Sequence, residues 1–343
     1  MNSFLPVETF ISHLPKVELH LHLEGSVRPE TLRELSRKKS PLRRQVGNWI
    51  SARRQDSYRY GSFDGFLKAF GVISLLLKTP EDYALATTRL AEELARQNVR
   101  YAEVTLGVGV LLWKKQSVEE VFDAVAAAAT AARAQLGIRL QWIFDPIRHF
   151  GVAHTREVLG WAIRFRDRGV LAFGIGGDEA RGPAKLFVEV FREAREAGLR
   201  LVAHAGEAVG PESIRHAVEL LGAERIGHGL TAIQDAEVMA LLRDRRIPLE
   251  VCPTSNVATG LIARFEDHPL PHFISRGLMV TLNSDDPAMF GTSLQEEFVR
   301  AARAFSLSRQ QIVGLAENAI RCSFLPEDEK QPLLLELMKF GGG

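Results

Sequence analysis

A chain of 343 residues can form one large α/β domain or two domains of average size, and its 46% hydrophobic residues can supply a sizeable core. The 43 lysines and arginines nearly balance the 42 aspartates and glutamates, which leaves a formal charge of +1. This balance argues against nucleic acid or an acidic membrane as a partner.

Targeting signals and disulfides are not indicated by the sequence. Residues 1–16 lack the basic start and long apolar run of a signal peptide, and no uncharged apolar run reaches about 18 residues. Two cysteines, Cys252 and Cys322, are too few for a disulfide framework, and each is better explained as a buried thiol than as a nucleophile. We therefore expect a cytoplasmic protein without a membrane span.

The first predicted strand, which starts at Val17, carries two histidines in alternating positions. In the stretch VELHLHLEG, residues 17–25, an extended backbone directs His20 and His22 to one face and three leucines to the other. Two imidazoles on one strand can bind one metal ion. A buried strand with two hydrogen-bonded histidines is the simpler explanation of this stretch alone, so the interpretation depends on further ligands.

A long excursion, residues 27–80, separates this strand from the next. It contains predicted helices over residues 29–38 and 62–77, and Phe66 and Phe70 share one face of the second helix. Between the helices lies a basic block, residues 38–59, for which a solvated surface is a simpler explanation than an anion-binding patch. Because an insertion after the first strand of a β/α barrel lies on the active face, residues 27–80 are predicted to form a helical lid.

Strands and helices alternate through the rest of the chain. Helices are predicted to start at the capping residues Thr79, Ser117, Ser293 and Ser308. No Gly/Ser/Pro linker divides the chain, so eight alternations predict a single domain over residues 1–343: a closed parallel (β/α)8 TIM barrel with extra helices at its C-terminus. A doubly wound open sheet is the alternative. After the first strand, the predicted strands are residues 100–106, 140–144, 170–175, 200–203, 225–226, 248–251 and 278–282.

Polar residues gather where several of these strands end. In a barrel, the carboxyl ends of all strands meet at one mouth, so these residues would lie together with His20 and His22. The sequences at these strand ends are His204-Ala205-Gly206-Glu207, Gly227-His228-Gly229, Cys252-Pro253-Thr254-Ser255-Asn256 and Asn283-Ser284-Asp285-Asp286-Pro287.

This set of residues indicates one metal ion. His20, His22, His204 and Asp285 offer three nitrogens and one oxygen, which suits a single Zn²⁺ per chain with a position left for water. A cation there lowers the pKa of its water towards neutrality.

Three further polar residues would surround such an ion. Glu207 is placed to act as general acid or base, and His228 to orient the water or accept its proton. Asp286 can hydrogen-bond a substrate nitrogen. The other six histidines, His268 among them, are interpreted as surface or structural residues.

A two-metal site bridged by a modified lysine is the rival arrangement, found in hydrolases of phosphoesters or cyclic amides. It would need a lysine at the end of the fourth strand. That strand ends with the sequence Gly174-Ile175-Gly176-Gly177-Asp178-Glu179, and the first lysine after it is Lys185. The glycines instead let backbone N–H groups approach a flat ligand closely. The sequence therefore favours one metal.

Taken together, these motifs resemble the adenosine deaminase family of zinc aminohydrolases, from about residue 15 to residue 323. Six motifs occur in the family's order. They are residues 17–25, Gly177-Asp178-Glu179, His204-Ala205-Gly206-Glu207, Arg225-Ile226-Gly227-His228-Gly229, Cys252-Pro253-Thr254-Ser255-Asn256 and Ser284-Asp285-Asp286-Pro287.

The resemblance implies a single-zinc barrel that replaces the 6-amino group of an adenine-type ring with oxygen and releases ammonia. Its small-molecule substrate would be a purine. The resemblance implies that the metal is held by His20, His22, His204 and Asp285. It implies that Glu207 protonates the ring nitrogen beside the reacting carbon and that His228 steers the hydroxide. Asp286 would accept a hydrogen bond at the five-membered ring, and Gly177 would donate its backbone N–H to the ring.

One residue departs from the pattern of adenosine-specific members. They usually have an aspartate where this chain has Glu24, at a position that would face the ribose 5′ end. Relatives with a glutamate include adenine deaminases, and the family also contains enzymes for 5′-modified adenosines such as aminodeoxyfutalosine. The leading hypothesis is a 6-aminopurine nucleoside deaminase, with His22, Glu24, Phe66 and Phe70 also contacting the substrate.

Three alternatives to this hypothesis remain. The first is deamination of free adenine. The second is a metal-dependent amidohydrolase acting on another substrate, and the third is a purine-binding relative without catalysis. The sequence carries no signal for the oligomeric state.

Overall fold

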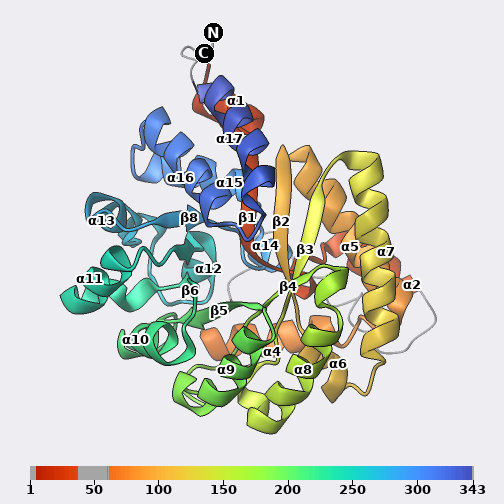
Figure 1. Ribbon diagram of the computed structural model, residues 1–343. Coiled ribbons are helices and arrows are strands. Elements are labelled where there is room, and N and C mark those ends of the chain that lie inside the picture. Colours follow the sequence, from red (N-terminus) through yellow and green to blue (C-terminus); the bar gives the residue numbers. More distant parts are fainter. Residues whose placement is uncertain (1–4, 38–59, 61, 342–343) are drawn as a thin grey trace.

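Eight parallel strands form the centre of the protein (Figure 1), whose computed structural model describes residues 5–37, 60 and 62–341. Each strand pairs with the next one along the chain, so their order in the sheet is that of the sequence. The strands are β1 Lys16–His22, β2 Val99–Leu106, β3 Arg139–Phe144, β4 Val170–Phe173, β5 Arg200–Ala205, β6 Arg225–His228, β7 Leu249–Val251 and β8 Val280–Leu282.

The two edges of this sheet meet between β1 and the residues that follow β8. Leu21 and Asp285 form a parallel bridge. The backbone N–H of His22 donates to the Asp285 carbonyl at 2.9 Å, and the N–H of Asp285 donates to the His20 carbonyl at 3.1 Å. These bonds bring the sheet into a barrel, so the predicted (β/α)8 architecture is confirmed and the doubly wound open sheet is wrong.

Helices surround the barrel, and polar side chains fix where several of them begin. Ser117, Ser293 and Ser308 each accept the backbone N–H of the residue three positions later, as predicted from their capping sequences. The helices are α1 Val7–His13, α2 Pro29–Arg37, α4 Phe63–Ser74, α5 Pro80–Arg96, α6 Val108–Trp113, α7 Val118–Leu136, α8 Val152–Arg164, α9 Val188–Glu196, α10 Glu212–His216, α11 Ala236–Asp244, α12 Pro253–Ala258, α13 Leu270–Ser275, α14 Pro287–Phe290, α15 Leu294–Ala304, α16 Arg309–Cys322 and α17 Glu327–Gly341.

Short turns complete the connections. They are the 3₁₀ turns η2 Glu24–Ser26, η3 Arg148–Phe150, η4 Arg166–Arg168, η5 Ala184–Phe187, η7 Leu230–Gln234 and η8 Phe265–Asp267, and the π-helical turn η6 Ala217–Leu221. None of the described helices is both long and apolar enough to span a membrane.

The excursion after β1 supplies helices α2 and α4, close to their predicted bounds. Aromatic contacts join α4 to the carboxyl-end face of the barrel, where Phe66 lies 5.1 Å from Phe290 and Phe70 presents its ring edgewise to His22 at 6.1 Å between centroids. The basic block over residues 38–59 lies outside the described residues. That the whole stretch of residues 27–80 acts as a lid stays a prediction.

The opposite end of the barrel is covered by the first and last helices. Figure 1 shows α1 and α17 together beside the two termini, and Phe10 contacts Phe340 at 4.9 Å between ring centroids. Between α16 and α17 the chain passes under the barrel, where Phe324 packs against a small buried cluster of Ile143, Ala172 and Val202. The predicted C-terminal helices therefore close the amino end of the barrel.

An aromatic cluster between strands and helices offers a test of this packing. Phe122 on α7 is fully buried and lies 4.7 Å from Phe165 and 5.2 Å from Phe144 between ring centroids. We predict that Phe122→Ala lowers the unfolding free energy by about 3–5 kcal/mol, because a large cavity replaces the ring. The control Leu335→Ala, at a side chain on α17 that is 54% exposed, should change it by less than about 0.5 kcal/mol in the same urea titration. Equal losses of unfolding free energy in Phe122→Ala and Leu335→Ala would contradict the burial of Phe122 in this aromatic cluster.

Candidate active site

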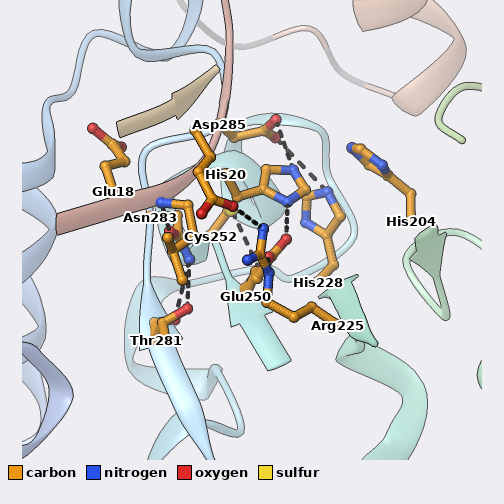
Figure 2. Close-up of polar contacts among 12 residues, drawn as sticks. Glu18, His20, His204, Arg225, His228, Glu250, Cys252, Thr281, Asn283 and Asp285 are labelled. Carbon is orange, nitrogen blue, oxygen red and sulfur yellow. Dashed lines mark hydrogen bonds and ion pairs between the residues drawn. The ribbon is translucent and has the colours of Figure 1, made fainter. Parts of the chain in front are cut away.

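Four predicted ligands meet at the carboxyl ends of the strands. His20 and His22 come from β1, His204 from β5 and Asp285 from the segment after β8. The Nε2 atoms of His20 and His22 lie 3.5 and 3.3 Å from Asp285 Oδ1. The Nε2 atoms of His22 and His204 lie 3.3 Å apart, so the four side chains surround a common point. Figure 2 shows three of them, His20, His204 and Asp285.

The donor atoms fit a zinc-like metal. One atom each from His20, His204, His228 and Asp285 lies within 4.8 Å of the others, and the same holds for His22, Asp285 and Asp286. In the described part of the chain, His20 Nε2 is buried without a hydrogen-bond partner. A buried imidazole nitrogen is normally satisfied, so this unpaired nitrogen, among two further imidazoles and a carboxylate, is what a bound cation would explain.

The orientation of Asp285 has two causes. Its backbone adopts a left-handed conformation with φ of 62°, which is uncommon for a residue with a side chain. The barrel-closing hydrogen bonds on either side of it hold this conformation. The Ser255 hydroxyl on α12 donates to Asp285 Oδ2 at 2.7 Å, which leaves Oδ1 to the histidines. Although burial opposes ionisation, the neighbouring imidazoles of His20 and His22 hold the pKa of Asp285 well below its usual value.

A chain of hydrogen bonds determines which nitrogen of His228 carries the proton. The backbone N–H of Leu270 donates to His268 Nδ1 at 3.1 Å, so the proton of His268 lies on Nε2, 3.3 Å from Asn256 Oδ1. The Asn256 amide in turn donates to His228 Nδ1 at 3.3 Å. Burial lowers the pKa of both His228 and His268 to about 3, so both rings are neutral. His228 therefore presents an Nε2–H group, 3.5 Å from Glu207 Oε1.

Glu207 is a buried carboxyl group whose surroundings favour its protonated form. Burial raises its pKa well above the usual value, and the charges of Asp285 and Glu179 raise it further. A carboxyl group that is protonated at neutral pH can donate a proton to a substrate. The structure thus places a proton donor beside the metal-binding residues.

The loop after β5 is held by one carboxylate that sequence reasoning quoted without a role. Glu179 accepts the backbone N–H groups of Gly206, Glu207 and Ala208 at 2.9–3.0 Å, and the Ser213 hydroxyl at 2.5 Å. Gly206 has a φ of 64°, which glycine adopts without strain. Glu179 therefore fixes the backbone that carries Glu207.

Asp286 and Glu24 each retain one buried oxygen without a partner in the described part of the chain. Burial raises the pKa of both carboxyl groups, and the neighbouring Asp285 charge raises that of Asp286 further. The other Glu24 oxygen accepts the backbone N–H of Gly107 at 3.1 Å. Gly25 has to be glycine, because a Cβ there would lie 1.6 Å from Asp286 Oδ1. Each of these carboxyl groups therefore keeps one buried oxygen that the described residues leave unpaired.

Gly177 and the two phenylalanines of α4 lie near the cluster. Gly177 has a φ of 91°, and a Cβ on it would lie 3.0 Å from His149 Nδ1. Phe70 contacts His22 edgewise, whereas Phe66 packs between Phe70 and Phe290. Of the two rings, only Phe70 is seen to contact a predicted metal ligand.

Two residues inside the barrel, below the cluster, received no role from the sequence: Arg225, which was quoted only within a motif, and Glu250, which was missed (Figure 2). Glu250 Oε2 is 2.9 Å from His20 Nδ1. Glu250 is the middle residue of the short strand β7. Side chains alternate between the two faces of a strand, and this alternation, already applied to His20 and His22, directs Glu250 towards the barrel interior. Its partner, 230 positions away, carries no local signal.

A cavity of about 490 Å³ opens beside Glu207, between the loops that follow β5, β6 and β7. Glu207 is the one predicted site residue among its lining residues, so the cavity adjoins the metal-binding cluster rather than containing it. Asp267 is its other charged lining residue. The apolar part of the lining consists of Ala208, Val209, Leu230, Ile233, Leu261, Ile262 and Pro269.

A (β/α)8 barrel with three histidines, an aspartate and a protonated glutamate at its mouth defines a metal-dependent hydrolase. A family model described as adenosine deaminase matches residues 15–340, and the chain belongs to the adenosine deaminase family. It is an aminohydrolase of that family, as the six motifs predicted.

Two curated relatives match nearly the whole chain. The aminodeoxyfutalosine deaminase of Streptomyces avermitilis is 39% identical, and the match covers 96% of this chain and 92% of the relative. An adenine deaminase of Mesorhizobium japonicum is 34% identical, with coverage of 94% and 98%.

Solved structures agree with the fold. The adenine deaminase of Arthrobacter aurescens superposes with a TM-score of 0.89 at 29% identity, covering 96% of this chain and 100% of that one. An amidohydrolase of Burkholderia ambifaria with bound Zn has a TM-score of 0.88 at 26% identity, with coverage of 99% and 95%.

The role of Glu179 can be tested by one substitution. Glu179→Gln keeps one acceptor oxygen but places an NH₂ group against backbone N–H donors, so we predict a loss of about 1.5–3 kcal/mol in unfolding free energy. The turnover number should also fall, because the backbone of Glu207 is no longer held in place. The zinc content should stay unchanged. Glu212→Gln, at an exposed side chain on neighbouring α10, is the control. An unchanged stability in the urea titration would show that these bonds do not hold the loop.

Proposed function

We propose that this protein is a zinc-dependent deaminase of a 6-aminopurine nucleoside, either adenosine or a 5′-modified adenosine such as aminodeoxyfutalosine. The reaction would yield the 6-oxo purine and ammonia. The observation that carries the proposal is a buried, protonated carboxyl group, Glu207, at the same barrel mouth as three imidazoles and a carboxylate. Replacing an amino group on an aromatic ring needs both a nucleophile at neutral pH and a proton for the ring.

The proposed metal ligands are His20, His22, His204 and Asp285, holding one zinc ion per chain. Zinc would lower the pKa of water and so supply the nucleophile at neutral pH. His228 faces the cluster with its Nε2–H, and it would donate a hydrogen bond to the attacking oxygen. The Nδ1 atom of His228 already accepts a hydrogen bond from Asn256. His228 would therefore orient the attacking oxygen by donating a hydrogen bond to it, and would not accept the proton of the attacking water.

Glu207 would transfer its carboxyl proton to the ring nitrogen beside the reacting carbon. This step lets the ring accept the electrons of the new C–O bond. Asp286 would bind the five-membered ring through its unpaired oxygen, and Gly177 would donate its backbone N–H to the purine. Phe70, and Phe66 behind it, would cover the ring and exclude water.

One observation supports a nucleoside over a free base. The relative named aminodeoxyfutalosine deaminase is 39% identical to this chain, against 34% for the adenine deaminase of M. japonicum. Glu24, buried beside His22 with one free oxygen, would contact the sugar side of the substrate.

Free adenine is the second candidate substrate. It is favoured by Glu24, which replaces the aspartate usual in adenosine-specific members, and by the similarity to proteins named adenine deaminase.

A substrate panel tests the proposal. Zinc-loaded protein is incubated with adenine, adenosine and aminodeoxyfutalosine, and the ultraviolet shift of the purine is followed. We predict that kcat/KM for at least one nucleoside exceeds that for adenine by tenfold or more. A preference for adenine would establish the second candidate. No turnover of any of the three, together with two metals per chain, would identify an amidohydrolase with another substrate.

The role of Glu207 predicts a second result. Glu207→Gln should lower kcat by about 10²–10⁴-fold because the general acid is lost, while metal analysis still finds one zinc per chain. Asp267→Asn, at the other charged residue of the cavity lining, is the control and should leave kcat within about twofold of the unmodified protein. A Glu207→Gln protein with full activity would remove Glu207 from the mechanism.

A further inference from the structure

A buried arginine occupies the interior of the barrel below the metal-binding cluster. The guanidinium of Arg225, only 1% exposed, donates to two carboxylates, from Nε to Glu250 and from Nη2 to Glu103, both at 2.5 Å. Its third nitrogen, Nη1, donates to the Cys322 carbonyl at 3.0 Å, and its Cζ lies 3.8 Å from the ring centroid of Phe324. All three nitrogens of this cation and one of its faces are therefore occupied by partners.

Glu250 joins this arginine to the proposed metal site. One of its oxygens accepts from Arg225, and the other lies 2.9 Å from His20 Nδ1 (Figure 2). A carboxylate can only accept, so the imidazole proton lies on Nδ1 and the lone pair on Nε2. Nε2 is the nitrogen that faces Asp285 and has no hydrogen-bond partner among the described residues.

Among the three proposed histidine ligands, His20 is the one whose Nδ1 atom has a hydrogen-bond partner in the described part of the chain. In the described part of the chain, no hydrogen bond is found to the Nδ1 atoms of His22 or His204. An outer partner fixes the tautomer and the ring orientation of a ligating histidine, and its loss typically weakens metal binding by about 10–100-fold. The position of one ligand therefore depends on Glu250, and the position of Glu250 depends on Arg225.

The arginine itself is held by the chain segment between α16 and α17. Phe324 covers one face of the guanidinium, and its backbone N–H donates to Glu103 Oε1 at 2.6 Å. The Tyr101 hydroxyl donates to the same oxygen at 3.0 Å. The C-terminal segment and the proposed metal site are thus connected by an unbroken series of contacts, from the partly buried Phe324 through the buried Arg225 and Glu250 to His20.

We propose that Arg225 and Glu250 are positioning residues for the metal, and that Phe324 holds Arg225 in place from the amino end of the barrel. This inference rests on the proposed metal site. Arg225 fixes the carboxylate of Glu250, Glu250 fixes the tautomer and orientation of His20, and His20 thereby offers Nε2 to the ion without rearrangement.

Three variants weaken successive contacts while preserving much of the side-chain volume. Glu250→Gln keeps an acceptor for Nδ1 but loses the charge that faces Arg225, and its zinc dissociation constant should rise about 10–100-fold. Arg225→Lys keeps the positive charge but cannot bind both carboxylates with a planar fork, so we expect a rise of about tenfold. Phe324→Leu removes the ring from the guanidinium face and should raise the constant by about threefold to tenfold.

Ile143→Val is the matched control. Ile143 belongs to the buried cluster on which Phe324 packs, and it contacts neither Arg225 nor Glu250 by a hydrogen bond. It should lower the unfolding temperature as the other variants do, because it removes a buried methylene group. Its zinc dissociation constant should stay within about twofold of that of the unmodified protein.

Zinc binding is measured by competition with a coloured chelator, on variants shown to be folded by circular dichroism. The visible spectrum of the cobalt-substituted proteins reports ligand geometry, and only the three contact variants should change it. The proposal is overturned if Glu250→Gln and Arg225→Lys bind zinc as the unmodified protein does, or if affinity falls equally in Ile143→Val. If Glu250→Gln does not fold, Arg225→Lys and Phe324→Leu decide by the same criteria. Failure of the unmodified protein to bind zinc would instead refute the proposed metal site itself.

Discussion

Closure of the barrel between its first and last strands is the constraint on which the site depends. The backbone bonds that join β1 to Asp285 are the bonds that set Asp285 beside His20 and His22. Fold and metal-binding geometry therefore form together. Asp285 adopts a left-handed backbone conformation because the closure and the direction of its carboxylate both require it.

The protein places carboxyl groups of opposite protonation state within a few ångströms of one another. The surrounding imidazoles lower the pKa of Asp285, whereas burial, followed by the charges of neighbouring acids, raises that of Glu207. His228 stays neutral between them and presents N–H rather than a lone pair, because a backbone amide at Leu270 sets the polarity of its hydrogen-bond chain. This separation agrees with the proposed roles of Asp285 in cation binding and of Glu207 in proton donation.

Beneath this mouth the barrel interior is charged rather than purely apolar. Arg225 between Glu103 and Glu250 is a fully paired buried cluster, and such clusters are costly unless each member keeps its partners. The C-terminal segment supplies two of those partners through the Cys322 carbonyl and the Phe324 ring. The helices after β8 thus do more than cover apolar surface, since they complete a network that reaches a proposed metal ligand.

Local patterns in the sequence determined the eight strands, the caps of the main helices, the alternation of His20 and His22, and the polar residues at the strand ends, because each depends on periods of two to four residues. The motifs in their order also identified the family, and they predict the ligand set, which stays a prediction. Tertiary structure alone decided the partner of His20, the proton position on His228 and the burial that protonates Glu207. These depend on side chains brought together from distant strands, and pairing across the interior of a barrel leaves no periodic trace along the chain.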